Sequence, residues 1–537
     1  MHTRFRLAAA LWVALAACGC SGAPGGPKTT LVFTGLTGEP DSLNPLVSNE
    51  ADVFNLSHLY ISDLVDSDGR GELYGELATR VPSRENGDVS ADGRTIVYHL
   101  RRGVRWQDGV PLTARDVVFS YRAVMNPANN VDTRVGYAEV ASIAAPDPAT
   151  VVVHLRRPFS PFIAYFGAPE GFGIFPEHLL GRYPNLNDVP YDQKPIGSGP
   201  YRVVEWKRGD SVVFEANPGY WRGKPHIARL IYRIVPDPNA RVQVLRTGEV
   251  DAIFEADPQQ LPQLRSMPGI RVVLTPVNDI HALVFNTADP VVGDRRVRQA
   301  VAYAIDRQKL LAVATYGSGI IVDADQPVNG SAYAPSPAGY RYDPAAARKL
   351  LDEAGWRGAP GATRSKNGRP LDLDFAIAPQ GITGSTLVAT VAQRYLNDVG
   401  IATRIKPYSP AVMWAVKAAG GIMASGRYQL AYYAWWVLGP DPDDSWQVAC
   451  DQIPPAGQNL YFWCNHRADA ATNDALATWD GPARKRDYAV VAQEIVADVP
   501  FFPLWQIRNP SAYRGTLHNF EPSPFGSVFW NAWSWSF

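Results

Sequence analysis

The sequence has few cysteines and, after its first apolar run, no long hydrophobic stretch. Its 537 residues include four cysteines, and apolar runs beyond Ala17 are broken by charge or proline within about ten residues, too short to span a membrane. An excess of charge of one sign is also missing, because 51 basic and 52 acidic residues give a net charge of −1. Neither nucleic acid nor a broad anionic surface is therefore indicated as a partner. We expect a large soluble protein.

Signatures of the common hydrolases and metalloenzymes are absent as well. The sequence contains no G-x-S-x-G, S-x-x-K or H-E-x-x-H motif, which removes the usual serine and zinc chemistries. The histidines are scattered without the spacing of metal ligands. We expect no enzymatic activity, no cofactor and no metal site. A secreted hydrolase remains an alternative, which turnover of a peptide or ester would support.

The N-terminus has the pattern of an export signal. Two arginines precede the apolar residues 7–17, a run too short to cross a bilayer. The run ends in a leucine, two alanines and Cys18, which resembles the lipobox of bacterial lipoproteins, whose cysteine is acylated and becomes the first mature residue. We predict a signal peptide over 1–17 and a lipid on Cys18, with the rest of the chain outside the cytoplasmic membrane. An ordinary cleaved signal, or Cys20 as the acceptor, remains an alternative.

A flexible tether and one pair of cysteines follow. Residues 18–30 are rich in glycine and proline, which is typical of a linker. Two cysteines remain in the body of the chain, Cys450 and Cys464, and two such cysteines in an exported protein usually form a disulfide. Closing a loop of this length stabilises a fold by about 3 kcal/mol. Two free buried thiols are the alternative.

The pattern of apolar residues predicts an α/β fold, in which short strands alternate with amphipathic helices. Thr113, Asp294 and Asp343 each precede a helical pattern as N-caps. Alternating or β-branched runs predict strands at 31–33, 95–100, 150–155, 211–214, 230–235 and 282–285. A chain of this length exceeds what one core supports, so we expect two or more lobes.

Several strings, taken in order, resemble one family. They are EPDSLNPL (39–46), DGRTIVYHLRRGVRWQDGVPLTARDVVFSY (92–121), PIGSGPY (195–201), RTGEVD (246–251), FNTADPVVGDRRVRQAVAYAIDR (285–307), YDPAAARKLLDEAGW (342–356) and VPFFPLW (499–505). Together they resemble the family 5 extracellular solute-binding proteins. These are the receptors for dipeptides, oligopeptides and other solutes in ABC import systems.

This resemblance implies a two-lobed periplasmic-binding-protein-like fold with a hinge, of type II and of the large cluster C form with an extra subdomain. Lobe I would comprise 28–55, 193–277 and 505–537, with an extension over 56–192, and lobe II would comprise 278–504. A solute bound between the lobes would favour their closed state. The implied partners are a peptide or other small solute and the permease and ATPase subunits of an importer, with the chain itself a monomer. A role in signalling or chaperoning is the alternative.

The resemblance also implies a ligand site around residues 434–446, AWWVLGPDPDDSW. Trp435 and Trp436 are expected at the ligand, although adjacent strand residues point to opposite faces, so one of the two is expected in the core. Leu438 stands where peptide-binding relatives carry the aspartate that binds the peptide amino terminus. A leucine cannot bind an ammonium group, and burying one without a countercharge is costly.

Two interpretations of Leu438 stay open. We predict that free-amino peptides are not the best ligands; the alternative is that another acid replaces the aspartate, the candidates being Asp441, Asp443, Asp444 and Glu50. In relatives the loop that corresponds to Asn49 and Glu50 faces the cleft. Trp414 and Trp505 are further aromatic candidates for ligand contact, since indoles offer a broad apolar surface and one N–H donor.

Overall fold

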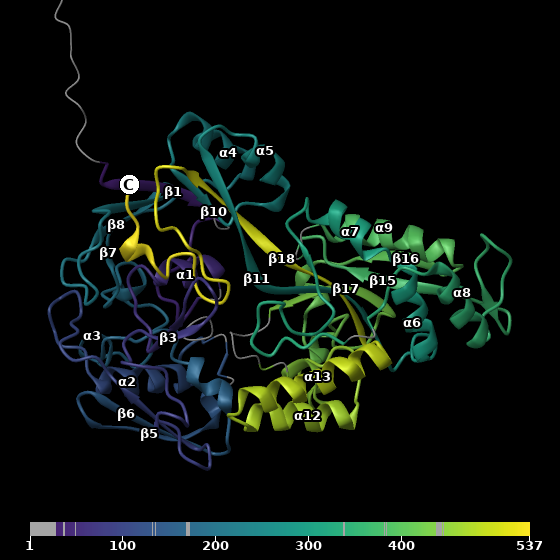
Figure 1. The fold of residues 1–537 in the computed structure, drawn as a ribbon, viewed down its shortest axis with the longest axis horizontal. Helices are drawn as coiled ribbons and strands as arrows, with labels where there is room; N and C mark the ends of the chain where they lie inside the picture. The colour runs from purple at the N-terminus through teal and green to yellow at the C-terminus, as the bar shows by residue number, and fades with distance from the viewer. Residues whose placement is uncertain are drawn as a thin grey trace, which may run out of the picture.

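The computed structural model describes residues 28–35, 38–48, 50–131, 133–134, 136–167, 172–336, 339–380, 382, 384–436, 443 and 445–537. Two lobes lie side by side and are joined by two long strands, β11 (Ile270–Phe285) and β18 (Phe501–Arg514), which run from one lobe into the other (Figure 1). Within the described ranges, no helix is both long and apolar enough to cross a membrane.

One 11-stranded sheet passes through both lobes. Its strands follow the order β16 (Ala402–Pro407), β15 (Asp372–Ile377), β17 (Leu430–Trp436), β11, β18, β10 (Ala252–Phe254), β1 (Thr30–Gly35), β9 (Arg229–Arg233), β8 (Ser211–Ala216) and β7 (Tyr201–Lys207), with β12 (Ile320–Ile321) paired to β18. The antiparallel pairing of β11 with β18 shifts register between Pro276 and Ile280. Extra residues in one strand bend a ladder locally, so the bend lies where the pair passes between the lobes.

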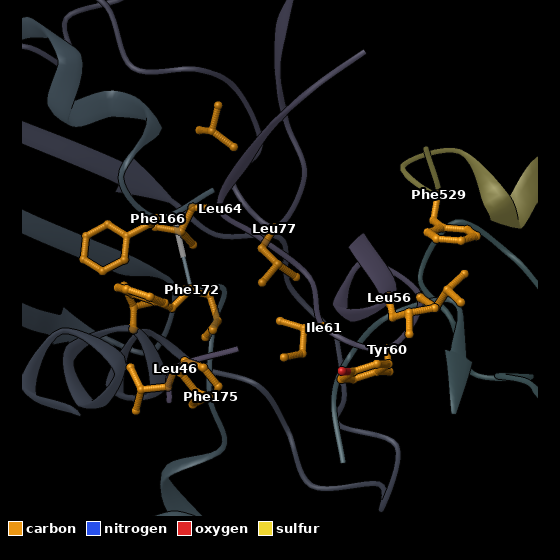
Figure 2. Packing of buried hydrophobic residues seen from close by; sticks show 14 of the residues in the cluster. Leu46, Leu56, Tyr60, Ile61, Leu64, Leu77, Phe166, Phe172, Phe175 and Phe529 are labelled. Atoms are coloured by element: carbon orange, nitrogen blue, oxygen red, sulfur yellow. The ribbon is translucent and has the colours of Figure 1, made fainter. Parts of the chain in front are cut away.

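Lobe I contains the first described residues, from Lys28 on, together with the chain end and an extension. Its remaining elements are α1 (Ala51–Ser57), β2 (Val65–Ser67), β3 (Leu73–Gly75), β4 (Thr95–His99), α2 (Ala114–Met125), η1 (Tyr137–Glu139), β5 (Val140–Asp147), β6 (Thr150–Leu155), η2 (Ser160–Ala164), α3 (Glu177–Leu180), η3 (Pro190–Asp192), α4 (Pro238–Thr247), η4 (Pro258–Gln260), α5 (Leu261–Arg265) and η7 (Ala532–Ser534). One apolar cluster packs most of these parts together, whereas α4 and α5 pack in a second cluster. Figure 2 shows Leu56 and Tyr60 near Phe529 of the C-terminal segment. The chain end therefore contributes to the same core as its first helix.

Lobe II covers its part of the sheet on both faces. The elements outside the sheet are α6 (Arg295–Ala304), α7 (Arg307–Ala314), α8 (Pro344–Glu353), β13 (Ser365–Lys366), β14 (Arg369–Pro370), α9 (Ser385–Asp398), α10 (Pro410–Met413), η5 (Lys417–Ala419), α11 (Ser445–Val448), η6 (Cys450–Gln452), α12 (His466–Ala477) and α13 (Gly481–Asp498). Helices α6 to α9 bury one face and α10 to α13 the other. A sheet covered on both faces has nearly continuous apolar strands, as the buried end of β11 has.

The local expectations from the sequence are largely confirmed. Thr113 and Asp116 form a capping box at the start of α2, and the Asp294 and Asp343 side chains accept backbone N–H groups at the starts of α6 and α8. The predicted strand at 282–285 is only the end of β11, which begins at Ile270. Its first half is partly exposed and lacks a strict alternation of apolar residues, so the pattern did not reveal it.

The backbone of the string PIGSGPY (195–201) packs closely against the backbone of Tyr60, which lies just after α1. A Cβ atom on Gly197 would lie 1.7 Å from the Tyr60 carbonyl oxygen, and one on Gly199 would lie 2.7 Å from the Tyr60 carbonyl carbon. No side chain fits there, so both positions require glycine for space. These residues serve the scaffold of lobe I.

Candidate functional site

A cavity of about 1090 Å³ lies where the lobes meet. Lobe I contributes residues 255–259, which follow β10. The two strands that join the lobes contribute side chains including Asp279, His281 and Trp505. Lobe II contributes the end of β17 and the segments 414–417 and 454–460. Cavities of this size at the junction of two lobes can enclose a small solute.

Aromatic rings form much of the lobe II wall. The Trp505 and His281 rings are stacked with their centroids 5.9 Å apart, and Tyr432 lies on the same side of the sheet, 5.6 Å from His281. Around the end of β17, Trp414 packs against Tyr433 with centroids 5.2 Å apart. All five side chains line the cavity. Such rings provide flat apolar surface and faces that attract cations.

A hydrogen-bonded chain of three polar side chains lies in this wall. The Tyr432 hydroxyl is 2.5 Å from His281 Nδ1, and His281 Nε2 is 3.1 Å from Asp279 Oδ2. An ionised carboxylate only accepts hydrogen bonds. With Asp279 ionised and His281 neutral, Nε2 donates a hydrogen bond to Asp279 and Nδ1 accepts one from the Tyr432 hydroxyl. The chain holds the Asp279 carboxylate at the lobe junction in one orientation.

Glu255 and Asp257 are carboxyl side chains of the opposite wall, and Glu255 is the one with an unusual environment. It directly follows β10, its φ is 52°, in the left-handed region that few residues other than glycine adopt, and its Oε2 accepts a hydrogen bond of 3.2 Å from Asn55. Burial and then the Asp52 charge raise the pKa of Glu255 to about 7, against the opposing effect of a hydrogen bond with Asn509. A strained backbone at a partly buried carboxyl group is the kind of feature that collects at ligand sites.

The aromatic residues singled out from the sequence fall into three groups. Trp414 and Trp505 line the cavity. Trp435 is 2% exposed and packs in the lobe II core against Phe501, with ring centroids 5.1 Å apart, as expected for one of the two adjacent tryptophans. Trp436 pairs with Asp279 through its backbone, and its side chain lies outside what the structure describes.

The remaining candidates from the sequence are not found at the cavity in the part of the chain that the structure describes. The structure does not describe Asn49, Leu438, Asp441 and Asp444. Glu50 accepts a hydrogen bond from the Asp41 backbone N–H, and Asp443 accepts two from Ser445 at the start of α11. Neither acid is among the described residues that line the cavity.

Sequence reasoning missed the polar groups that do line the cavity, above all Glu255, Asp279 and His281. One signal for the last two is present in the string NDIHALVF, where polar residues alternate within an otherwise apolar strand. Polar side chains two positions apart in a strand share one face, so this pair could have been read as a polar patch on a buried sheet. No comparable signal marks Glu255.

Cys450 and Cys464 come together in lobe II, with Sγ atoms 2.11 Å apart and Cα atoms 4.7 Å apart. They enclose the segment that supplies cavity residues 454–460. By geometry, two groups of side chains could hold a metal ion. The first is Cys450 and Cys464 with His466, but sulfur atoms at bonding distance from each other offer no thiolate ligands. The second is His58 with Asp63 and Asp66. Neither group lies on the cavity wall formed by the described residues.

Comparison with known proteins defines the class. The model for bacterial extracellular solute-binding proteins, family 5 Middle, matches residues 72–452. The chain therefore belongs to the family 5 extracellular solute-binding proteins, and its two-lobed architecture is that of the type II binding-protein fold.

Individual relatives agree with this class. The chain is 34% identical to protein XP55 of Streptomyces lividans, over 63% of this chain and 59% of XP55. It is 30% identical to the glutathione-binding protein GsiB of Salmonella choleraesuis, over 81% of this chain and 82% of GsiB. The crystal structure of NikZ from Campylobacter jejuni in complex with Ni(L-His) has a TM-score of 0.75 and 25% identity, and the match covers 95% of this chain and all of NikZ.

Proposed function

We propose that this chain is an extracytoplasmic binding protein that captures a peptide or another small solute between its lobes and delivers it to an ABC importer. The observation that carries the proposal is the cavity of about 1090 Å³ lined by both lobes of a family 5 binding protein. GsiB binds glutathione and the NikZ structure contains Ni(L-His), so members of this class take small solutes of differing chemistry. No catalytic step is part of the proposal.

The hinge of the proposed receptor is the pair of strands β11 and β18. Their register shift between Pro276 and Ile280 lies at the boundary proposed from the sequence, with lobe I over 28–55, 193–277 and 505–537 and lobe II over 278–504. A bend in only two strands allows the lobes to rotate, and a bound solute favours closure through contacts made with both walls.

The proposed receptor is anchored to the membrane by a lipid on Cys18. The support is the basic, apolar and small-residue pattern that ends at this cysteine, together with the glycine-rich segment that would separate lipid from fold. Labelling with palmitate in cells should be lost in Cys18→Ala, and globomycin should block processing of the wild type. Labelling that persists without Cys18 and Cys20 contradicts the anchor.

A thermal-shift screen tests the function itself. The purified mature chain is heated with pools of di- to pentapeptides, N-acetylated peptides, amines, metal–amino-acid complexes and oligosaccharides. A solute at 100 times its Kd stabilises the fold by about 2.7 kcal/mol, which raises Tm measurably. Hits are then tested for uptake in cells with and without the gene. Binding without any change in uptake would favour signalling or chaperoning, and turnover of a hit would favour the hydrolase.

A further inference from the structure

We propose that the cavity selects solutes that carry a protonated amine or a guanidinium group, and that Asp279 is the carboxylate that binds this cation. The proposal rests on the solute-binding function and adds the chemical class of the solute. Its starting point is the Asp279 carboxylate on the cavity wall, of which one oxygen has a hydrogen-bond partner and the other has none among the described residues.

Asp279 uses only one of its oxygens within the described part of the chain. Oδ2 accepts a hydrogen bond from His281 Nε2, whereas Oδ1 is buried and has no hydrogen-bond partner among the described residues. A buried acceptor without a partner costs free energy, and more so when it is charged. Because His281 is itself held by Tyr432, the carboxylate cannot easily turn away. When the lobes close on a solute, an N–H⁺ donor of that solute would satisfy Oδ1.

The position of Asp279 suits a contact with a solute held between the lobes. It lies at the register shift of β11, beside cavity residue Val277, and pairs with Trp436 at the end of β17. Burial, and next the Asp279 charge, raise the pKa of both Tyr432 and Tyr433 well above its usual range. The Asp279 charge therefore acts on tyrosines on both faces of β17.

The rest of the wall favours a cation as well. Among the described residues that line the cavity, the carboxyl side chains are Glu255, Asp257 and Asp279, and Lys417 is the one lysine or arginine. Glu255 and Asp257 belong to lobe I and Asp279 to lobe II, so a cation between them gains contacts from both sides when the lobes close. The aromatic faces of Tyr433 and Trp414 add attraction for a positive group.

This arrangement bears on the leucine at position 438. The sequence left open whether another acid replaces the aspartate that peptide-binding relatives carry there. Glu50 and Asp443 do not line the cavity, but Asp279 does. A countercharge for an ammonium group is thus available from a different strand, which favours cationic solutes despite Leu438.

The test compares each solute that raises Tm with a counterpart lacking the positive charge. Suitable pairs are trialanine with N-acetyl-trialanine, Nα-acetylarginine amide with Nα-acetylcitrulline amide, and spermidine with its fully acetylated form, which separate a peptide amino terminus from a free amine or guanidinium. Affinities are measured by titration calorimetry. The charged member should bind at least about tenfold more tightly than its neutral counterpart, the value of one charge-assisted hydrogen bond.

Two variants identify the residue. Asp279→Asn keeps an oxygen that can accept a hydrogen bond from His281. It should lower the affinity for the charged solute of each pair by at least about tenfold and leave the affinity for the neutral solute unchanged. Glu249→Gln removes an exposed carboxylate of lobe I that does not line the cavity, and should change affinity by less than about threefold. Unfolding midpoints of the free variants establish that both fold, and the wild-type comparison of charged with neutral solutes holds whether or not Asp279→Asn folds.

The failures are distinguishable. If neutral peptides or oligosaccharides bind as tightly as charged solutes, or if Asp279→Asn binds the charged member as the wild type does, the inference is wrong and solute binding stands. If no pool shifts Tm at all, the proposed function fails with it.

Discussion

Glu255 should make the free protein less stable as the pH rises. Its pKa is raised from 4.5 to about 7, first by burial and then by the Asp52 charge. Between these values the folded chain binds more protons than the unfolded chain does. The contribution of Glu255 is therefore fully present below pH 4.5 and is lost as the pH rises through about 7.

The size of the loss follows from the shift. Each pKa unit corresponds to 1.36 kcal/mol, so the full shift is worth about 3 kcal/mol, and because the side chain borders a cavity open to water we expect about 2 kcal/mol. Replacing Glu255 with glutamine keeps an acceptor for Asn55 and removes the charge. Between pH 4.5 and 8, the free energy of unfolding of Glu255→Gln should therefore fall by about 2 kcal/mol less than that of the wild type.

Urea unfolding at a series of pH values measures this difference. The control is Glu249→Gln. Glu249 is an exposed residue of the same lobe and does not line the cavity. Its pH dependence should match that of the wild type. If Glu255→Gln and the wild type lose the same stability between pH 4.5 and 8, the buried charge at Glu255 does not have the effect described.

Three further substitutions test the scaffold by urea or thermal unfolding. Cys450→Ser should lower the free energy of unfolding by about 3 kcal/mol, and dithiothreitol should lower that of the wild type equally; no effect of either would mean that Cys450 and Cys464 are not bonded. Trp435→Ala should cost about 3–5 kcal/mol because it opens a space in the lobe II core, whereas a cost below about 1 kcal/mol would indicate a surface position. Gly197→Ala should destabilise lobe I, since its Cβ would lie 1.7 Å from the Tyr60 oxygen; an unchanged Tm would show that the backbones are not this close.

Local chemistry was predictable from the sequence because it depends on near neighbours. Thr113, Asp294 and Asp343 cap helices through backbone groups two or three residues away, so a short window contains all the information. The strings shared with the family likewise identified the fold, since several of them in order belong to one architecture.

The cavity wall was less predictable because distant segments form it. Asp279 reaches the lobe junction through a register shift with β18, whose residues come more than 200 positions later, and no window of sequence contains that pairing. Trp505 and Trp435 look alike in sequence, yet one lines the cavity and the other packs against Phe501 in the core. The segment 437–442, on which the resemblance placed the ligand contact, lies outside the described residues.

The most direct test of solute capture between the lobes is hydrogen exchange with and without the strongest hit from the thermal-shift screen. Binding should slow exchange at residues 255–259 of lobe I and at 414–417 and 430–436 of lobe II together, because both walls contact the same solute. Protection confined to one lobe, or to residues away from the cavity, would contradict it.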